Sequence, residues 1–284
     1  MNILYLFTSL NIVTGWWCNG HMTTAMIAQL DLLKDSPSVL EKAKSILAPL
    51  DGIYTHGLAN TFVGSACWAD DVKVFGLSGM DSWHFIDQPY NQVGLLSTTA
   101  SEEDIIWALD KVLNTLGKTK TPAFESSYMM RYLIHFLGDI HQPLHTTTLW
   151  NRNFLSSDAG GNLFKIIFDD NITELHALWD GGMGIMGDLI PRPLDTNSYL
   201  QIETWALWSM GNYTRDTLKD LLAEEDRLEW TRFNYHVAVD HAYKGIEENT
   251  RPSEEYLSSN WVIIMRQLAL GGYRLADILR KLYS

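Results

Sequence analysis

Two pairs of histidine and aspartate with the same spacing stand out in this sequence. They are His135-Phe-Leu-Gly-Asp139 and His176-Ala-Leu-Trp-Asp180, and His145 lies between them. Residues four apart on a helix project from the same face, so each pair can present an imidazole and a carboxylate together. Zinc binds both groups, and the repeated pair indicates more than one metal site and metal-assisted hydrolysis. For either pair alone, we would favour an ordinary helix with a capping or salt-bridged histidine.

Three further residues join the candidate ligands because their neighbours in the sequence are aromatic or apolar. His21 follows two tryptophans, Asp70 follows Trp68-Ala69, and His84 follows Trp83. An unpaired charge is costly in such a setting, so a metal or another partner is expected. We interpret the remaining histidines as satisfied core residues: His56, His141, His236 and His241.

The elements that must position these residues are predicted to be mainly helical. Apolar residues recur at helical spacing through most of the chain, with helix starts at Pro37 and after the capping sequence 101–104. Pro143 should end or kink the helix over 126–139. Further helices are predicted over residues 200–228 and 261–282. The one convincing strand is 163–168, so we expect an all-α domain with at most a small β-hairpin.

Length and composition favour one domain that follows a secretory signal. The chain has 284 residues, 46% of them hydrophobic, and no break in composition that would separate two domains. Residues 1–15 are apolar and end in small residues, which predicts a signal peptide cleaved before Trp16 and a domain over 16–284. As a membrane anchor, this run is too short for about 30 Å of hydrocarbon. We therefore expect a secreted, lysosomal or vacuolar monomer without a stable membrane anchor.

The net charge of −13 limits the classes of function. It argues against a protein that holds nucleic acid on a broad basic face, because phosphates must then be neutralised by clustered Lys and Arg. It does not exclude a hydrolase of phosphate esters, since bound divalent ions can supply the local positive charge.

Two glycosylation triplets and two cysteines fit an oxidising, secretory environment. Asn171-Ile-Thr173 and Asn212-Tyr-Thr214 are acceptor sequences for N-linked glycans. Cys18 and Cys67 both lie beside candidate ligands in the sequence and could form a disulfide. Two free buried thiols are the alternative.

In combination, these segments resemble the zinc-dependent, single-strand-specific nucleases of the S1/P1 type, which include plant bifunctional nucleases and protist 3′-nucleotidase/nucleases. The resemblance implies the helical fold of phospholipase C and single-strand nucleases, and it extends from Trp16 to Ala276. Each segment is weak evidence alone, whereas their ordered combination is specific. The matching segments are Trp16-x4-His21, Trp68-Ala-Asp70, His84-Phe-Ile-Asp87, His135-x3-Asp139-x2-Gln-Pro-Leu-His145, Gly160-Gly-Asn162 and His176-x3-Asp180.

The resemblance implies a cluster of three zinc ions. The first ion would take Asp70, His84, His135 and Asp139. The second would share Asp139 and take His21 together with the amino nitrogen and carbonyl of Trp16. An α-amine is free only after the signal is cleaved, and it must lose its proton to bind zinc. The third ion would take His145, His176 and Asp180.

The resemblance also implies hydrolysis of the P–O3′ bond in single-stranded RNA and DNA, and dephosphorylation of 3′-nucleotides. Asp139 would bridge two zinc ions that lower the pKa of the attacking water, and Asp70 would orient that water. Lys73 stands where many relatives have an arginine. It would bind the phosphate less rigidly, unless it is an ordinary exposed lysine.

Base recognition is expected beside the metals. Phe85 would stack on a base and Asp87 would accept a hydrogen bond from a base edge, with core packing and a turn cap as the alternatives. Stacking needs an unstacked nucleotide, which agrees with a preference for single strands. Gly160, Gly161 and Asn162 would line the same pocket, where glycine lets the backbone approach closely.

Two other functions stay open. A zinc-dependent phospholipase C shares the helical fold and three metals, but its pattern has Glu in place of Asp180 and lacks the long insertion between His145 and His176. A secreted zinc-binding protein without catalysis would keep the ligands, but it would leave Lys73 and Phe85 unexplained.

Overall fold

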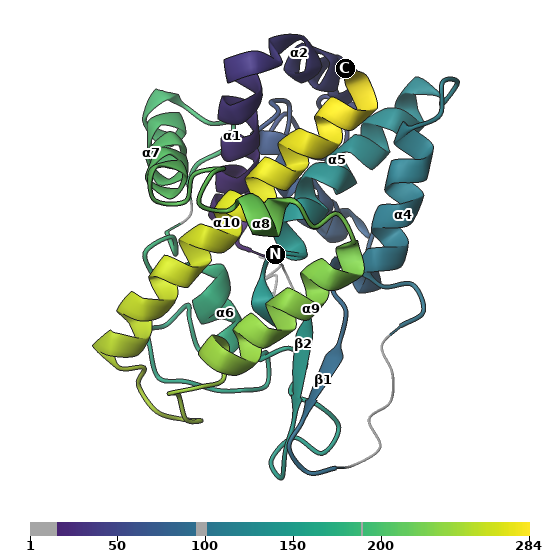
Figure 1. Ribbon diagram of the computed structural model, residues 1–284. Coiled ribbons are helices and arrows are strands. Elements are labelled where there is room, and N and C mark those ends of the chain that lie inside the picture. The colour runs from purple at the N-terminus through teal and green to yellow at the C-terminus, as the bar shows by residue number, and fades with distance from the viewer. Residues whose placement is uncertain (1–15, 95–100, 189) are drawn as a thin grey trace, which may run out of the picture.

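A computed structural model describes residues 16–94, 101–188 and 190–284, so the predicted signal peptide lies outside the described residues. Helices dominate and confirm the expected mainly helical class (Figure 1). The α-helices are α1 Cys18–Asp35, α2 Pro37–Leu47, α3 Trp68–Asp71, α4 Ile105–Leu116, α5 Ala123–Asp139, α6 Leu175–Asp180, α7 Thr196–Asn212, α8 Lys219–Leu222, α9 Arg227–Val237 and α10 Glu254–Tyr283. The 3-10 helices are η1 Ala48–Leu50, η2 Gly64–Cys67, η3 Val72–Phe75, η4 Asp81–His84 and η5 Pro143–His145, and η6 Ala238–Ala242 is a π-helical turn.

Helices α1, α5 and α10 form the centre of the molecule. α1 packs along α10 and α7, and α5 packs against α4, α2 and α10 (Figure 1). Two adjacent glycines let α10 approach both partners. A Cβ on Gly272 would lie 2.5 Å from Cβ of Ile27, and one on Gly271 would lie 2.7 Å from the carbonyl oxygen of Leu137. This close packing sets α1 beside α5, and these two helices carry three of the predicted ligands.

Proline and aspartate determine several helix boundaries. Pro37 occupies the first turn of α2, as predicted. Asp104, rather than Ser101, caps α4, because its carboxylate accepts hydrogen bonds from two backbone N–H groups of the first turn. α5 ends at Asp139, and Pro143 opens the 3-10 helix that follows.

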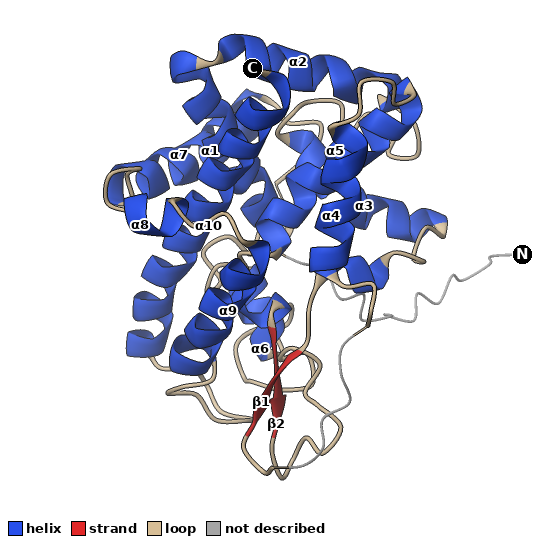
Figure 2. Cartoon of the chain, turned by 45° about the vertical axis from the view of Figure 1, so that its right-hand side comes forward, coloured by secondary structure: helices blue, strands red, loops and turns tan. Residues whose placement is uncertain are grey.

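The two β-strands form a parallel pair rather than the predicted hairpin. β1 Gln88–Asn91 and β2 Thr147–Trp150 lie side by side, with Gln88 opposite Thr147 (Figure 2). Parallel strands need a long connection, and here the connection contains α4 and α5. The sequence gives little sign of this pair, because both strands are short and β1 contains Pro89.

The predicted strand over 163–168 is not part of the described sheet. The segment forms an isolated antiparallel bridge between Lys165 and Glu174, where the backbone N–H of Ile166 donates to Thr173 and that of Leu175 donates to Phe164. Its alternating pattern is nevertheless used, because Phe164 and Ile166 are buried in the core. The apolar alternation therefore predicted an extended segment, but it did not predict a paired strand.

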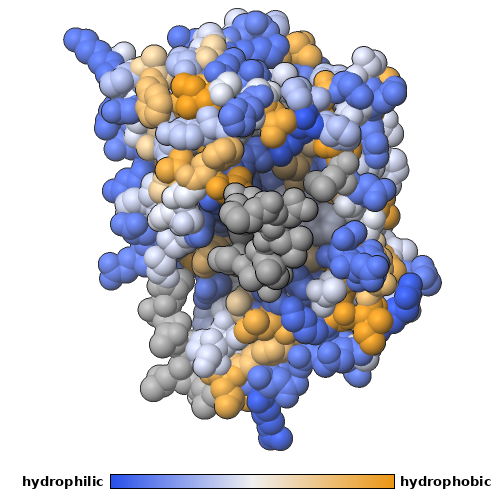
Figure 3. All heavy atoms as spheres, turned by 180° about the vertical axis from the view of Figure 1, so that it is seen from behind, coloured by the Kyte–Doolittle hydropathy of each residue, from blue (hydrophilic) through white to orange (hydrophobic). Residues whose placement is uncertain are grey.

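Two apolar clusters form the core, and α1 contributes to both. Met22 and Met26 pack in the cluster that contains Trp179, whereas Ala28 packs in the cluster that contains Trp68. α1 is therefore buried on all sides over most of its length. On the face shown in Figure 3, hydrophobic side chains occur in separate groups among hydrophilic ones. Within the described residues, we find no helix that could cross a membrane.

Candidate metal centre

The end of α5 gathers the residues predicted for the first zinc ion. His135 and Asp139 are fully buried, with 3.1 Å between His135 Nε2 and Asp139 Oδ2. Nδ1 of His84 lies 2.9 Å from the same carboxylate oxygen and 3.1 Å from His135 Nε2. Oδ2 of Asp70 lies 3.6 Å from His135 Nε2. Nitrogen and oxygen atoms from three segments of the sequence, at residues 70, 84 and 135–139, thus converge here.

One ring nitrogen of His135 is directed at this cluster. Its Nδ1 donates to the carbonyl oxygen of Ala66 at 2.6 Å, so Nε2 faces Asp139 and Asp70. Burial lowers the pKa of His135, but the charges of the two carboxylates outweigh burial and raise this pKa to about 9. The two carboxylates therefore favour a proton on Nε2 of His135 in the metal-free protein. A divalent cation would satisfy the same carboxylates and release that proton on binding, which fits a metal site.

The residues predicted for the third zinc ion form a second group. Nε2 of His145 lies 3.2 Å from Nε2 of His176, and the latter lies 3.2 Å from Oδ2 of Asp180. The Nδ1 atoms of both rings donate at 2.7 Å to backbone carbonyl oxygens, those of His84 and Gly160. Burial lowers the pKa of His145 to about 3, so its Nε2 presents a lone pair. Two imidazole nitrogens and a carboxylate facing one point, with both rings fixed from behind, are a donor set suited to zinc.

His21 reaches the cluster from α1. Its Nε2 lies 3.3 Å from Oδ1 of Asp139, and its ring stacks on His135 with 3.8 Å between centroids. Gly138 makes room for the ring, because a Cβ there would lie 2.5 Å from His21 Nδ1. The ligand atoms of His21 also group with those of Asp70 and His135. The predicted assignment, in which His21 and Asp139 share an ion, stays a prediction.

Trp16 also lies beside the end of α5. Its side chain is fully buried, and its indole N–H donates to the carbonyl oxygen of Gly138 at 2.9 Å. Gly20 accommodates the indole, since a Cβ on Gly20 would lie 2.8 Å from Cβ of Trp16. The side chain thus packs in the core beside α5. Whether its amino nitrogen binds zinc stays a prediction that requires cleavage before Trp16.

A disulfide between Cys18 and Cys67 decides between the two alternatives left by the sequence. The two Cα atoms are 5.3 Å apart, and the bond joins the first residue of α1 to the end of η2. His21 follows the first cysteine by three residues, and Asp70 follows the second by three. The cross-link therefore holds the two segments that bring these predicted ligands together.

Lys73 is buried and contacts one predicted metal ligand, Asp70. Its Nζ lies 2.8 Å from Oδ1 of Asp70 and 3.9 Å from Oδ1 of Asp81. The ordinary exposed lysine is therefore excluded. Next to Asp70, Asp71 forms a two-pronged ion pair with Arg192, with both N–O distances at 2.7 Å. No spacing in the sequence could have predicted that pair.

A small cleft contains most residues predicted for base recognition. Its lining residues are Phe85, Asp87, Leu144, Ala159, Gly160, Asn162 and His176. Burial and the charge of Asp158 raise the pKa of Asp87 to about 6. Gly160 has a φ of +62°, and a Cβ there would lie 2.6 Å from the carbonyl oxygen of Leu144. Gly161 does not line the cleft; it packs against Leu144 and Leu175.

Gln142 is a buried residue that the sequence reasoning missed. Its Oε1 accepts from the backbone N–H of Leu144 at 2.6 Å, which orients the amide so that Nε2 donates to Oδ1 of Asp180 at 2.7 Å. Its backbone N–H donates to the backbone carbonyl oxygen of Asp139, and its own carbonyl oxygen accepts from the backbone N–H of His145. Gln142 therefore contacts predicted ligands of both groups. The only feature of the sequence that could have identified Gln142 is its position between Asp139 and His145.

Asp158 is a second missed residue, and it organises the loop that contains Gly160. The fully buried carboxylate accepts from the backbone N–H of Leu149 at 2.8 Å and from Oγ1 of Thr148 at 3.2 Å. The backbone N–H of Gly160 donates to the same Oγ1 at 3.3 Å. The loop is thus anchored to β2, which directs the carbonyl of Gly160 at His176.

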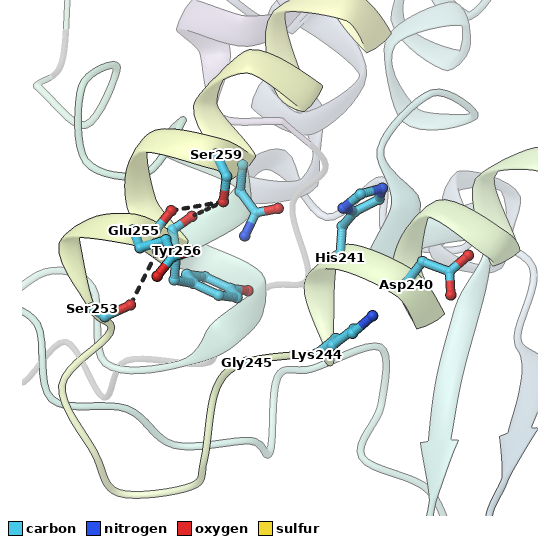
Figure 4. Close-up of a pocket in the computed structure, with 9 residues that line it drawn as sticks. Asp240, His241, Lys244, Gly245, Ser253, Glu255, Tyr256 and Ser259 are labelled. Carbon is cyan, nitrogen blue, oxygen red and sulfur yellow. Dashed lines mark hydrogen bonds between the residues drawn. The ribbon is translucent and has the colours of Figure 1, made fainter.

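The other histidines lie outside these groups, but not all are core residues. His141 is buried; its Nδ1 donates to the carbonyl oxygen of Leu137 and its Nε2 accepts from Arg274. His56 and His236 are exposed, and His241 is half-buried, so the core interpretation was wrong for the first two. His241 lines a separate cleft of about 380 Å³ between the π-helical turn and the start of α10 (Figure 4). None of the predicted site residues lines that cleft.

Both predicted glycosylation residues are exposed. Asn171 lies in a turn where Asp169 accepts its backbone N–H, and Asn212 ends α7. Nδ2 of Asn212, the atom that would carry a glycan, donates to the carbonyl oxygen of Trp208 at 2.8 Å.

A mainly helical domain whose buried histidines and aspartates form groups suited to metal ions defines the class of protein. The profile of the S1/P1 nuclease family matches residues 16–284, and the chain belongs to this family. It is 26% identical to Endonuclease 2 of Arabidopsis thaliana, covering 100% of this chain and 96% of that protein. It is also 26% identical to Nuclease S1 of Aspergillus oryzae, with 92% and 90% covered, and to Nuclease P1 of Penicillium citrinum, with 95% and 98% covered. Membership supports a hydrolase of single-stranded nucleic acids.

Proposed function

We propose that this chain is a secreted phosphoesterase with three zinc ions that hydrolyses the P–O3′ bond of single-stranded RNA and DNA and dephosphorylates 3′-nucleotides. The observation that carries the proposal is the convergence of buried imidazole nitrogens and carboxylate oxygens in two adjoining groups. In the first group, Oδ1 of Asp139 and both ring nitrogens of His21 are buried without a hydrogen bond, which a divalent cation would resolve.

The proposed ligands keep the predicted assignment. Asp139 would be shared between two ions, because its two oxygens face different histidines: Oδ2 faces His84 and His135, and Oδ1 faces His21. The remaining ion would be bound by His145, His176 and Asp180. When bound, zinc lowers the pKa of a coordinated water and offsets negative charge on phosphate and leaving oxygen.

Asp70 and Lys73 would act together beside the reacting phosphate. The ammonium group of Lys73 fixes one oxygen of Asp70, which leaves Oδ2 directed at His135. Asp70 would thereby orient the attacking water, and Lys73 would supply a positive charge to the phosphate. An ammonium is a point charge without the two-pronged geometry of a guanidinium, so this contact would tolerate more than one phosphate orientation.

The cleft beside His176 would bind the base of the nucleotide whose 3′ oxygen leaves. Phe85 and Asp87 line it from one side and Asn162 from another. A ring for stacking and polar groups for a base edge suit an unpaired nucleotide. Cleavage before Trp16 would free the amine expected to bind zinc, and secretion fits the disulfide and the exposed Asn171.

The experiment that tests this function is phosphate release from 3′-AMP compared with 5′-AMP. The protein begins at Trp16, and His135→Ala serves as the control. Release from 3′-AMP alone, lost in the control, is the expected result. No release despite full zinc occupancy would contradict the nucleotidase activity. Parallel assays with single-stranded DNA and phosphatidylcholine would then separate a strict polymer nuclease, a phospholipase C and a zinc-binding protein without catalysis.

A further inference from the structure

Two exposed apolar residues, Val74 and Phe75, follow Lys73 directly and form what we call the apolar step. Val74 is 74% exposed and Phe75 is 49% exposed, and both belong to the short helix η3. Val74 is the most exposed large hydrophobic residue of the described chain. Gly76, with a φ of +83°, ends the helix immediately afterwards. Single exposed apolar residues are common on folded proteins, but two adjacent ones next to a buried functional lysine require an explanation.

A second ring lies beside Phe75. The ring of the exposed His56 meets that of Phe75 edge to face, with 6.0 Å between centroids. This contact places the turn around His56, including the exposed Ile53 and Tyr54, next to η3. Flat rings that remain half open to solvent can each take a nucleobase, whatever its identity.

The position of this step relative to the proposed site determines which base it would meet. Phe75 is two residues from Lys73, so their Cα atoms are at most about 7.6 Å apart. Lys73 contacts Asp70 of one ligand group, whereas Phe85 lines the cleft with His176 of the other group. The backbone of Phe85 follows His84 of the first group, but its ring lines the cleft beside His176 of the other group, whereas Phe75 follows Lys73 on the Asp70 side. A phosphate bound between the groups would then join two nucleotides directed towards different rings.

Resting on the proposed function, we infer that Phe75, with His56 beside it, is a stacking subsite for the base of the nucleotide on the 5′-oxygen side of the cleaved phosphate. A polymer supplies a base there, and a 3′-mononucleotide does not. The step therefore contributes to polymer binding and leaves mononucleotide hydrolysis unaffected.

The test compares Phe75→Ala with Phe124→Ala, a control because Phe124 is also half exposed, at 51%, and belongs to α5 far from the ligands in sequence. Loss of one stacking contact of about 1–3 kcal/mol corresponds to roughly a 5- to 150-fold increase in KM for single-stranded DNA. The kcat/KM for 3′-AMP should stay unchanged, and Phe75→Trp should restore polymer binding. An unchanged polymer KM, or an equal loss with both substrates, would overturn the inference.

A binding measurement keeps this inference separate from the proposed function. The Kd of a fluorescent phosphorothioate oligothymidylate can be measured without turnover, and Phe75→Ala should raise it by the same factor. A wild-type chain that binds the oligonucleotide but hydrolyses nothing would contradict the proposed function alone. Equal Kd values for wild type and Phe75→Ala would contradict the stacking subsite alone.

Discussion

Replacing Gln142 by leucine tests whether a residue that binds no metal determines the affinity for one. Leucine keeps most of the volume but removes both hydrogen bonds, the one to Asp180 at 2.7 Å and the one from Leu144 at 2.6 Å. A hydrogen bond to a charged group contributes about 1.5–3 kcal/mol, and the buried N–H left without an acceptor costs about 1–3 kcal/mol. We therefore expect a destabilised metal-free protein and an Asp180 carboxylate that is no longer fixed by one oxygen.

Loss of such an orienting contact typically lowers metal affinity about 10- to 100-fold. If the three proposed zinc ions are bound, the expected result is that one of them leaves the Gln142→Leu protein at a chelator concentration lower by that factor, while the other two stay bound. The assay is zinc content by mass spectrometry after dialysis against graded chelator. Gln267→Leu is the matched control, because Gln267 is fully buried and its amide contacts His141 and Asn234 rather than a predicted ligand.

Gln142→Glu separates the two hydrogen bonds. It keeps an acceptor for Leu144 and replaces the donor to Asp180 with a carboxylate, so it should also lose the ion. Wild-type zinc retention in both Gln142 variants would refute the reasoning that this amide positions Asp180. An equal loss of zinc in Gln267→Leu would show that removing any buried amide near α5 has the same effect.

Three further predictions follow from burial, cross-linking and backbone conformation. The pKa of His135 is raised in the folded state to about 9, compared with about 6.5 in the unfolded chain. Its contribution to the stability of the metal-free protein is therefore complete below about pH 6.5 and disappears as the pH rises through about 9. Urea unfolding with and without zinc should show this loss of stability only without metal. Replacing Cys18 and Cys67 by serine removes a cross-link that spans 49 residues. The loop entropy of the unfolded chain predicts that this lowers the free energy of unfolding by about 4 kcal/mol, and calorimetry should show a much lower Tm. Gly160→Ala should cost about 1–3 kcal/mol, because its φ of +62° and the carbonyl of Leu144 at 2.6 Å exclude a Cβ, whereas Gly211→Ala in α7 meets nothing within 4 Å and should leave the Tm unchanged or raised.

Local spacing predicted the parts of the centre that lie on one helix. The pairs ending in Asp139 and Asp180 needed only the helical repeat, and both are found on helices with the imidazole near the carboxylate. The packing of one helix against another has no local signal. The approach of His21 to Asp139 depends on the glycines of α10, and the contact between Gln142 and Asp180 depends on how α6 lies against the chain after α5.

The same distinction explains the errors in the fold. The alternation over 163–168 reported the burial of Phe164 and Ile166, which an extended segment paired at a single bridge also needs. The parallel strands were missed because pairing between residues 88–91 and 147–150 is set by two intervening helices rather than by a turn. Ser101 and Asp104 were both suitable caps, and only the backbone direction selected Asp104.

The ability to bind metal depends on the packing of α10 against α1, although α10 itself carries none of the proposed ligands. Every proposed ligand lies between Trp16 and Asp180, whereas Gly271 and Gly272, which set α1 beside α5, are made much later during synthesis. A message with a premature stop codon before α10 would still encode the complete ligand inventory. Its product would leave the ribosome with all of the histidines and aspartates but without the helix that packs against both α1 and α5. For this chain, a truncated transcript that retains every motif should therefore be read as a loss of function.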